Sequence, residues 1–156
     1  MTERLARFVA LSALLTGFNA VRLHGSGMAE DYLSLLDRIV TIPTVDDLLD
    51  TLERLPVDHE GDRLEAAILE DVRFGPIARN LIILWYCGTW SQLPAAWRAA
   101  YGESPLDTTH VVSGAAYQAG LQWVAAGAHP AGAKQQGFGA WALGPGGRGH
   151  GERDVL

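Results

Sequence analysis

The sequence predicts an all-α fold: a compact domain of about five to six helices over residues 1–126, followed by an extended glycine-rich arm over residues 127–156. Apolar residues recur three and four positions apart through most of the first part, which is typical of amphipathic helices. No stretch shows the alternation of apolar and polar residues that predicts a strand. With 156 residues, about half of them apolar, the chain is long enough to bury one core without disulfides or a metal.

The first apolar segment fits two interpretations. Two arginines precede the apolar run of residues 8–15, and residues 18–20 resemble a weak cleavage site, as in a short signal peptide. An amphipathic helix explains the same residues, because Glu3 suits the positive end of a helix dipole and Thr16-Gly17 can end the helix. We favour the helix, whose apolar face comprises Leu5, Phe8, Val9, Ser12 and Leu15.

Three further amphipathic segments follow. Residues 28–40 carry one apolar stripe, and Thr44 is placed to cap a helix over residues 45–55 that Pro56 ends. The third segment, residues 63–73, is expected to bury one face, which comprises Leu64, Ala67, Ile68 and Val72.

The second half of the domain centres on residues 77–86, which are apolar nearly all round and predict a buried helix ending at Gly88. Residues 94–101 predict a short helix and residues 102–107 a loop. A last helix is expected over residues 111–126. Small side chains on one of its faces should let another helix approach closely, and this face comprises Val112, Ala115, Ala116, Ala119 and Trp123.

The C-terminal segment has the composition of a docking arm. Ordering a glycine-rich chain costs much backbone entropy, so its aromatic residues Phe138 and Trp141 are expected to be buried against another surface. Residues 142–156 are low in complexity and are predicted to be disordered unless a partner holds them. The sequence therefore predicts that this segment binds a partner protein.

Composition argues against several other classes of ligand. The formal charge of −6 and the lack of a Lys/Arg cluster disfavour nucleic acid. No segment reaches the roughly 20 apolar residues that span a bilayer. A single cysteine, Cys87, excludes an internal disulfide and fits a small buried hydrophobe.

No catalytic, cofactor-binding or metal-binding residues are predicted. The glycine-rich stretches follow no predicted strand, and the five histidines lack the spacing of metal ligands. His129 lies where the last helix gives way to the arm, and there it can dock or cap. Among the tryptophans, Trp85 and Trp123 suit the core, whereas Trp141 and Trp90 suit an interface.

Three segments of the chain resemble the small subunits of membrane-associated FAD-containing sorbitol, fructose and glucose dehydrogenase complexes. The segments are Leu-Ser-Ala-Leu-Leu-Thr-Gly-Phe at residues 11–18, Leu-Trp-Tyr-Cys-Gly-Thr-Trp at 84–90, and Tyr-Gln-Ala-Gly-Leu-Gln-Trp at 117–123, the last continuing through 127–130 to Gly-Phe-Gly-Ala-Trp at 137–141. They occur in the family's order, and the resemblance extends over residues 7–145. The C-terminal motif is the most specific of the three.

The resemblance implies a non-catalytic subunit. In that family the small chain packs against a large flavoprotein of the glucose-methanol-choline (GMC) type, which binds FAD and oxidises a sugar or polyol, and a cytochrome c subunit often takes the electrons. We therefore expect no cofactor on this chain and FAD on its partner. The expected contacts are Tyr117, Trp123, His129, Pro130, Lys134, Phe138 and Trp141.

Two questions stay open at the level of sequence. The resemblance implies a periplasmic or membrane-peripheral complex, but the twin-arginine leader of many family members is missing before residue 7, so a cytoplasmic complex is the alternative. The function also has alternatives, a dedicated chaperone or adaptor that leaves its folded client, and a small self-sufficient enzyme with a site near His129 or His110.

Overall fold

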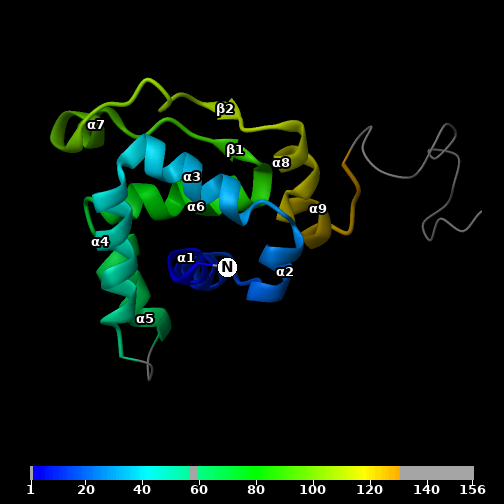
Figure 1. Cartoon of the computed structure of the whole chain (residues 1–156), viewed down its shortest axis with the longest axis horizontal. Coiled ribbons are helices and arrows are strands. Elements are labelled where there is room, and N and C mark those ends of the chain that lie inside the picture. Colours follow the sequence, from blue (N-terminus) through cyan, green and yellow to red (C-terminus); the bar gives the residue numbers. More distant parts are fainter. Residues whose placement is uncertain (1, 57–59, 131–156) are drawn as a thin grey trace, which may run out of the picture.

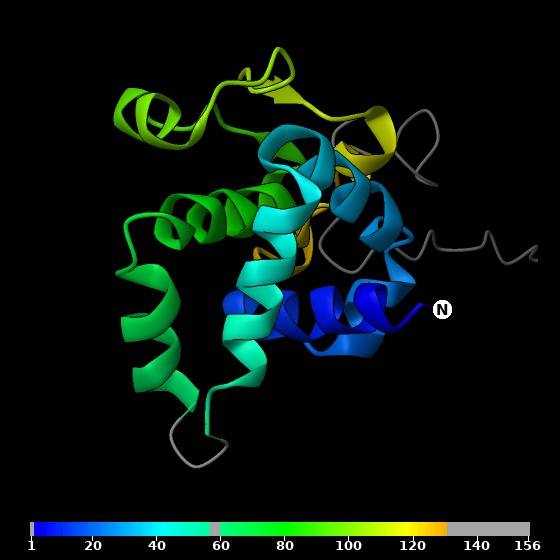
Figure 2. The same ribbon diagram turned by 60° about the vertical axis from the view of Figure 1, so that its left-hand side comes forward.

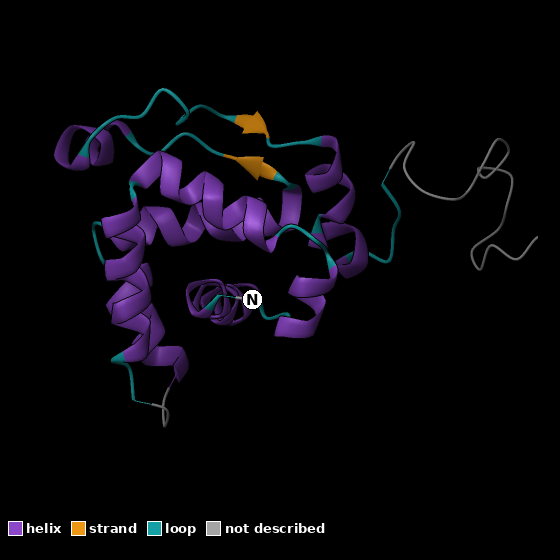
Figure 3. Cartoon of the chain, viewed as in Figure 1, coloured by secondary structure: helices purple, strands orange, loops and turns teal. Residues whose placement is uncertain are grey.

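The computed structural model describes residues 2–56 and 60–130, and helices dominate this part of the chain (Figure 1). The all-α prediction is confirmed. Within the described ranges the strands are the two-residue pair β1 (Thr89–Trp90) and β2 (His110–Val111), which run antiparallel above the helices in Figure 3. Hydrogen bonding places Thr89 opposite Val111 and Trp90 opposite His110.

Four helices form the N-terminal half, and their ends follow from local side chains. They are α1 (Glu3–Thr16), α2 (Ala20–Gly25), α3 (Ala29–Val40) and α4 (Ile42–Glu53). The Thr2 hydroxyl caps α1 by accepting from the Leu5 amide, and Gly17 ends it in the left-handed conformation, as the Thr16-Gly17 pair predicted. The short helix α2, capped by the Asn19 side chain, was not predicted, because six residues carry too little periodicity.

The predicted start of the fourth helix is wrong. The helix begins at Ile42 with Pro43 in its first turn, and Thr41, not Thr44, is the preceding cap residue. Thr41 has a φ of +78°, which is uncommon for a residue with a branched side chain. The turn between α3 and α4 is therefore tighter than the sequence indicated.

The predicted helix over residues 63–73 is also wrong in its second half. The helical segment α5 (Glu60–Leu64) passes into a π-helical turn, η2 (Glu65–Leu69), which lies beside α4 in both Figure 1 and Figure 2. The Asp71 carboxylate then accepts from the backbone amides of Arg73 and Phe74 and starts the next helix. This local capping leaves Val72 77% exposed, whereas Leu64 and Ile68 are buried as predicted.

Helix α6 (Phe74–Cys87) is the central helix that the sequence predicted. Trp85 lies on its buried side, with its ring 6.3 Å from that of Phe8 and 4.8 Å from that of Tyr32. These contacts join α1, α3 and α6 into one core. Gly88 ends α6 in the left-handed conformation, with a φ of +67°.

Salt bridges fasten α1 to its neighbours on the outside of this core. Arg4 contacts Asp37 of α3 at 2.6 Å and Asp46 of α4 at 2.7 Å, and Arg7 contacts Asp50 and Glu53 of α4. The hydrogen bond to Asp37 is the main reason that the pKa of Arg4 is raised further, so this guanidinium stays charged. These partly exposed pairs orient the helices more than they stabilise them.

The predicted last helix is interrupted. Its first residue, Val111, belongs to β2, and the rest forms α8 (Gly114–Ala119) and α9 (Leu121–Ala125), which meet at Gly120. A side chain at Gly120 would meet the Tyr86 carbonyl oxygen at 2.6 Å, and one at Gly88 would meet the Ala116 carbonyl at 2.5 Å. The chain does approach α6 closely here, but the residues that permit it are Gly88 and Gly120, which do not belong to the predicted face.

The buried Tyr32 makes stability depend on pH. Burial is the main cause that raises the pKa of its phenol above the usual value of 10. Above pH 10 the unfolded chain ionises this group while the folded chain keeps its proton, so the free energy of unfolding should fall as pH rises from about 10. Urea denaturation between pH 9 and 11 should show this decline, and Tyr32→Phe, which keeps the ring beside Trp85, should reduce it. An equal decline in both proteins would contradict the assignment.

Candidate functional site

An apolar groove of about 680 Å³ lies between α2 and the α8–α9 turn. In Figure 1 these elements face each other at one end of the domain, next to the point where the described chain ends. The groove is lined by Val21, Arg22, Gly25, Ser26, Gln118, Ala119, Gly120, Leu121, Trp123, Val124, Gly127, Ala128, His129 and Pro130.

Two aliphatic side chains on different elements of the groove are open to solvent. Val21 on α2 is 81% exposed and Val124 on α9 is 50% exposed. A single exposed valine needs no explanation, but two that line the same hollow with half-buried Trp123 form an apolar patch. An apolar patch that lines a hollow of this size is a candidate binding surface.

Trp123 is held rigidly within this patch. Its indole nitrogen donates to the Tyr117 carbonyl oxygen at 2.8 Å, and the two rings meet edge to face at 5.4 Å between centroids. The indole N–H is therefore already satisfied, which leaves the apolar ring to contact a ligand. The expectation that Trp123 belongs to the core is corrected: its side chain is half-buried on α9.

The end of α9 aims the chain along the groove. Gly127 has a φ of +66°, its amide donates to the Val124 carbonyl, and the Ala128 amide donates to the Trp123 carbonyl at 2.7 Å. This pair of bonds is a Schellman motif, the usual way in which a glycine ends a helix. His129 and Pro130 consequently line the groove.

The predicted contact residues fall into two groups. Trp123, His129 and Pro130 line one groove, and Tyr117 supports the Trp123 ring without lining it. Lys134, Phe138 and Trp141 lie outside the described residues. The sequence reasoning missed Val21 and the rest of α2, for which the Asn19 cap was the available signal.

Trp90, which was assigned to an interface, lies in the interior instead. It is fully buried, and its indole nitrogen donates to Asp107 Oδ1 at 2.9 Å. The same oxygen accepts from the Leu93 amide at 2.9 Å, so one carboxylate ties the residues after β1 to the loop that precedes β2. Neither contact is local in sequence, which is why the pattern around Trp90 did not reveal it.

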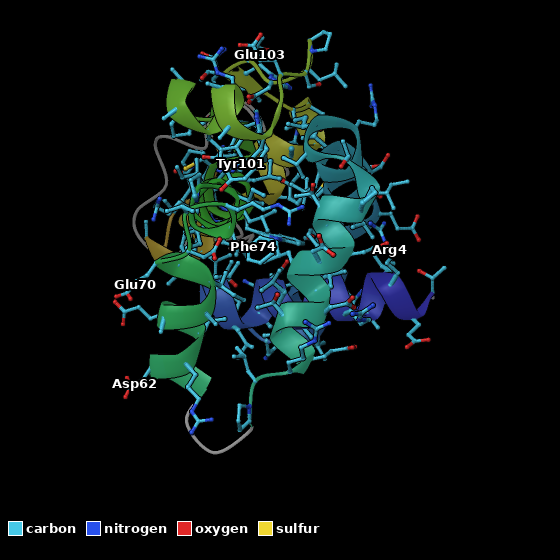
Figure 4. All side chains as sticks on the ribbon, turned by 90° about the vertical axis from the view of Figure 1, so that its left-hand side faces the viewer. Arg4, Asp62, Glu70, Phe74, Tyr101 and Glu103 are labelled. Carbon is cyan, nitrogen blue, oxygen red and sulfur yellow. The ribbon has the colours of Figure 1, made fainter. Side chains whose placement is uncertain are left out.

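A second hollow, of about 770 Å³, lies between the loop after η2 and α7 (Ala95–Tyr101). Exposed Val72 and Tyr101 line it, with the Trp97 ring packed 5.3 Å from that of Tyr101. Figure 4 shows Glu70, another lining residue, at the outer edge of this side of the molecule. None of the predicted contact residues within the described ranges lines this hollow, so it provides a control surface.

Among the described residues, no three His, Cys, Asp or Glu side chains gather as metal ligands. Cys87 is half-buried, and its thiol donates to Gln122 Oε1 at 3.7 Å, next to the groove-forming helix. Of the helices that the structure describes, none is both long and apolar enough to cross a membrane.

Comparison of the chain with protein-family models, with curated proteins and with solved structures found no match.

Proposed function

We propose that this chain is a non-catalytic small subunit that binds and stabilises a large FAD-dependent dehydrogenase of the GMC type acting on a sugar or polyol. The observation that supports it best is the apolar groove, which combines exposed aliphatic side chains with a rigid tryptophan and leads into the glycine-rich arm. FAD belongs to the large subunit in this proposal. A cytochrome c subunit, which the resemblance implies, is a further expected member.

The groove has the features of a binding hot spot. Aromatic side chains that are held in place before binding lose little conformational entropy, and they contribute most of the energy when water is excluded around them. Trp123 meets the first condition through its bond to the Tyr117 carbonyl. Val21 and Val124 lie where a partner would exclude water from it.

A charge placed in the groove tests this role. Val124→Glu should lower the affinity for the co-expressed flavoprotein at least tenfold, because binding would bury a charged carboxylate in place of an apolar side chain. Val72→Glu is the matched control, since it places the same charge on a valine that is 77% exposed in the second hollow. Co-purification with a tagged chain and titration of the purified subunits measure both. Equal loss in the two variants, or in neither, would contradict the groove as the docking surface.

Removal of residues 131–156, most of the arm, tests how much they contribute to binding the flavoprotein. Deleting residues 131–156 leaves the Schellman motif and every described core residue in place, so the helical circular dichroism and the thermal unfolding of the domain should be retained. Assembly with the flavoprotein should be abolished, because Lys134, Phe138 and Trp141 are lost. A truncated chain that still co-purifies at full yield would show that the arm is dispensable.

A further inference from the structure

We infer that in the free chain the groove is covered by the chain's own residues 131–156, with Phe138 and Trp141 as anchors, and that the flavoprotein takes the place of this segment on assembly. The second half of this statement rests on the proposed function, whereas the first half concerns the isolated chain alone. The inference names an occupant for a surface that is otherwise apolar and open among the described residues.

The segment starts at the wall of the groove. The Schellman motif at Gly127 turns the chain back from α9, and both His129 and Pro130 line the groove. Residue 131 therefore follows directly from the wall of the groove.

The segment is also long enough to reach the groove from Pro130. Phe138 and Trp141 are eight and eleven residues beyond Pro130, so an extended chain would carry them at most about 26–40 Å. A glycine-rich chain of this length has an average span of about 14–20 Å. Such a tether gives an effective concentration of about a millimolar, which lets even a weak apolar contact form within one molecule.

The segment and the groove are also complementary in chemistry. Residues 135–147 contain no charged side chain but include Phe138, Trp141 and Leu143. The groove presents Val21, Val124 and the Trp123 ring, which match such a segment. The second hollow also presents apolar side chains, but it lies at α7, on the opposite side of the domain from the end of the described chain (Figure 1), so this segment reaches it less readily.

The experiment places p-benzoylphenylalanine at position 124 of the full-length chain, purifies the monomer without flavoprotein, and maps photo-crosslinks by mass spectrometry. We expect crosslinks within one chain to residues 135–143, unchanged on tenfold dilution, and at least fivefold fewer from the probe at control position 72. In a Phe138→Ala/Trp141→Ala chain the yield from position 124 should fall at least fivefold. Absence of crosslinks to this segment, or crosslinks only between chains, would overturn the inference.

Addition of the flavoprotein separates the two proposals. If it binds, the crosslinks from position 124 should move from residues 135–143 to the flavoprotein. Intrachain crosslinks with no binding of the flavoprotein would leave self-covering in place and reject the proposed function. If a chain without intrachain crosslinks bound the flavoprotein, the proposed function would stand and self-covering of the groove would be rejected.

Discussion

Gly88→Ala is expected to lower the free energy of unfolding by about 2–5 kcal/mol. Gly88 has a φ of +67°, where a residue with a Cβ costs about 1–2 kcal/mol. The added methyl carbon would also lie 2.5 Å from the Ala116 carbonyl, and overpacking of this kind costs about 1–3 kcal/mol. Since both contacting atoms belong to backbone, α8 must move away from α6. Urea denaturation measures the loss.

Gly17→Ala is the matched control for this substitution. Gly17 has a similar φ of +78°, but a Cβ there would have no heavy atom within 4 Å. Gly17→Ala should therefore lower the free energy of unfolding only by the cost of a Cβ at positive φ, about 1–2 kcal/mol. If both variants lost the same stability, the close contact between Gly88 and α8 would not be the cause of the loss in Gly88→Ala.

Asp107→Ala is expected to lower the free energy of unfolding by about 2–6 kcal/mol, because two buried donors lose their acceptor. Asp107 is 3% exposed, and its Oδ1 accepts from both Trp90 Nε1 and the Leu93 amide. Each buried donor left without an acceptor costs about 1–3 kcal/mol. The Trp90 indole proton should also exchange faster with solvent, which nuclear magnetic resonance detects as a residue-specific signature.

Asp107→Asn distinguishes the hydrogen bonds from the charge. The amide oxygen can still accept from Trp90 and Leu93, and the amide nitrogen replaces Oδ2, which is buried without a hydrogen-bond partner in the described structure. We expect less than half of the loss seen with alanine and a protected Trp90 indole proton. A loss as large as that of the alanine variant would show that the charge, and not the two accepted bonds, stabilises this loop.

Local signals predicted the helices whose limits depend on their own residues. The apolar spacing and the Thr16-Gly17 end were sufficient for α1, and the apolar character of residues 77–86 identified α6 as the central helix. The end of α6 at Gly88 was also readable, because glycine is the residue that best adopts the left-handed conformation.

The errors arise where distant contacts override local pattern. Gly120, where α8 and α9 meet, lies against the Tyr86 carbonyl, and the buried Trp90 donates to Asp107; periodicity reveals neither contact. Val72 was placed on a buried face because its spacing is helical, but η2 already ends at Leu69, and the Asp71 side chain starts α6 after it.

The candidate site was half predictable. The sequence indicated Trp123, His129 and Pro130 as neighbours along the chain, and the structure shows that they share a groove. The opposite wall comes from α2, about a hundred residues earlier, and its contribution through Val21 required the tertiary arrangement.

The most direct test of the central claim is co-expression of the tagged full-length chain with the GMC-type flavoprotein whose reading frame lies nearest its own, followed by purification and a visible absorption spectrum. We predict flavin absorbance and a large chain in a near one-to-one ratio with this one. A colourless chain that elutes alone beside a soluble, folded flavoprotein would contradict the account.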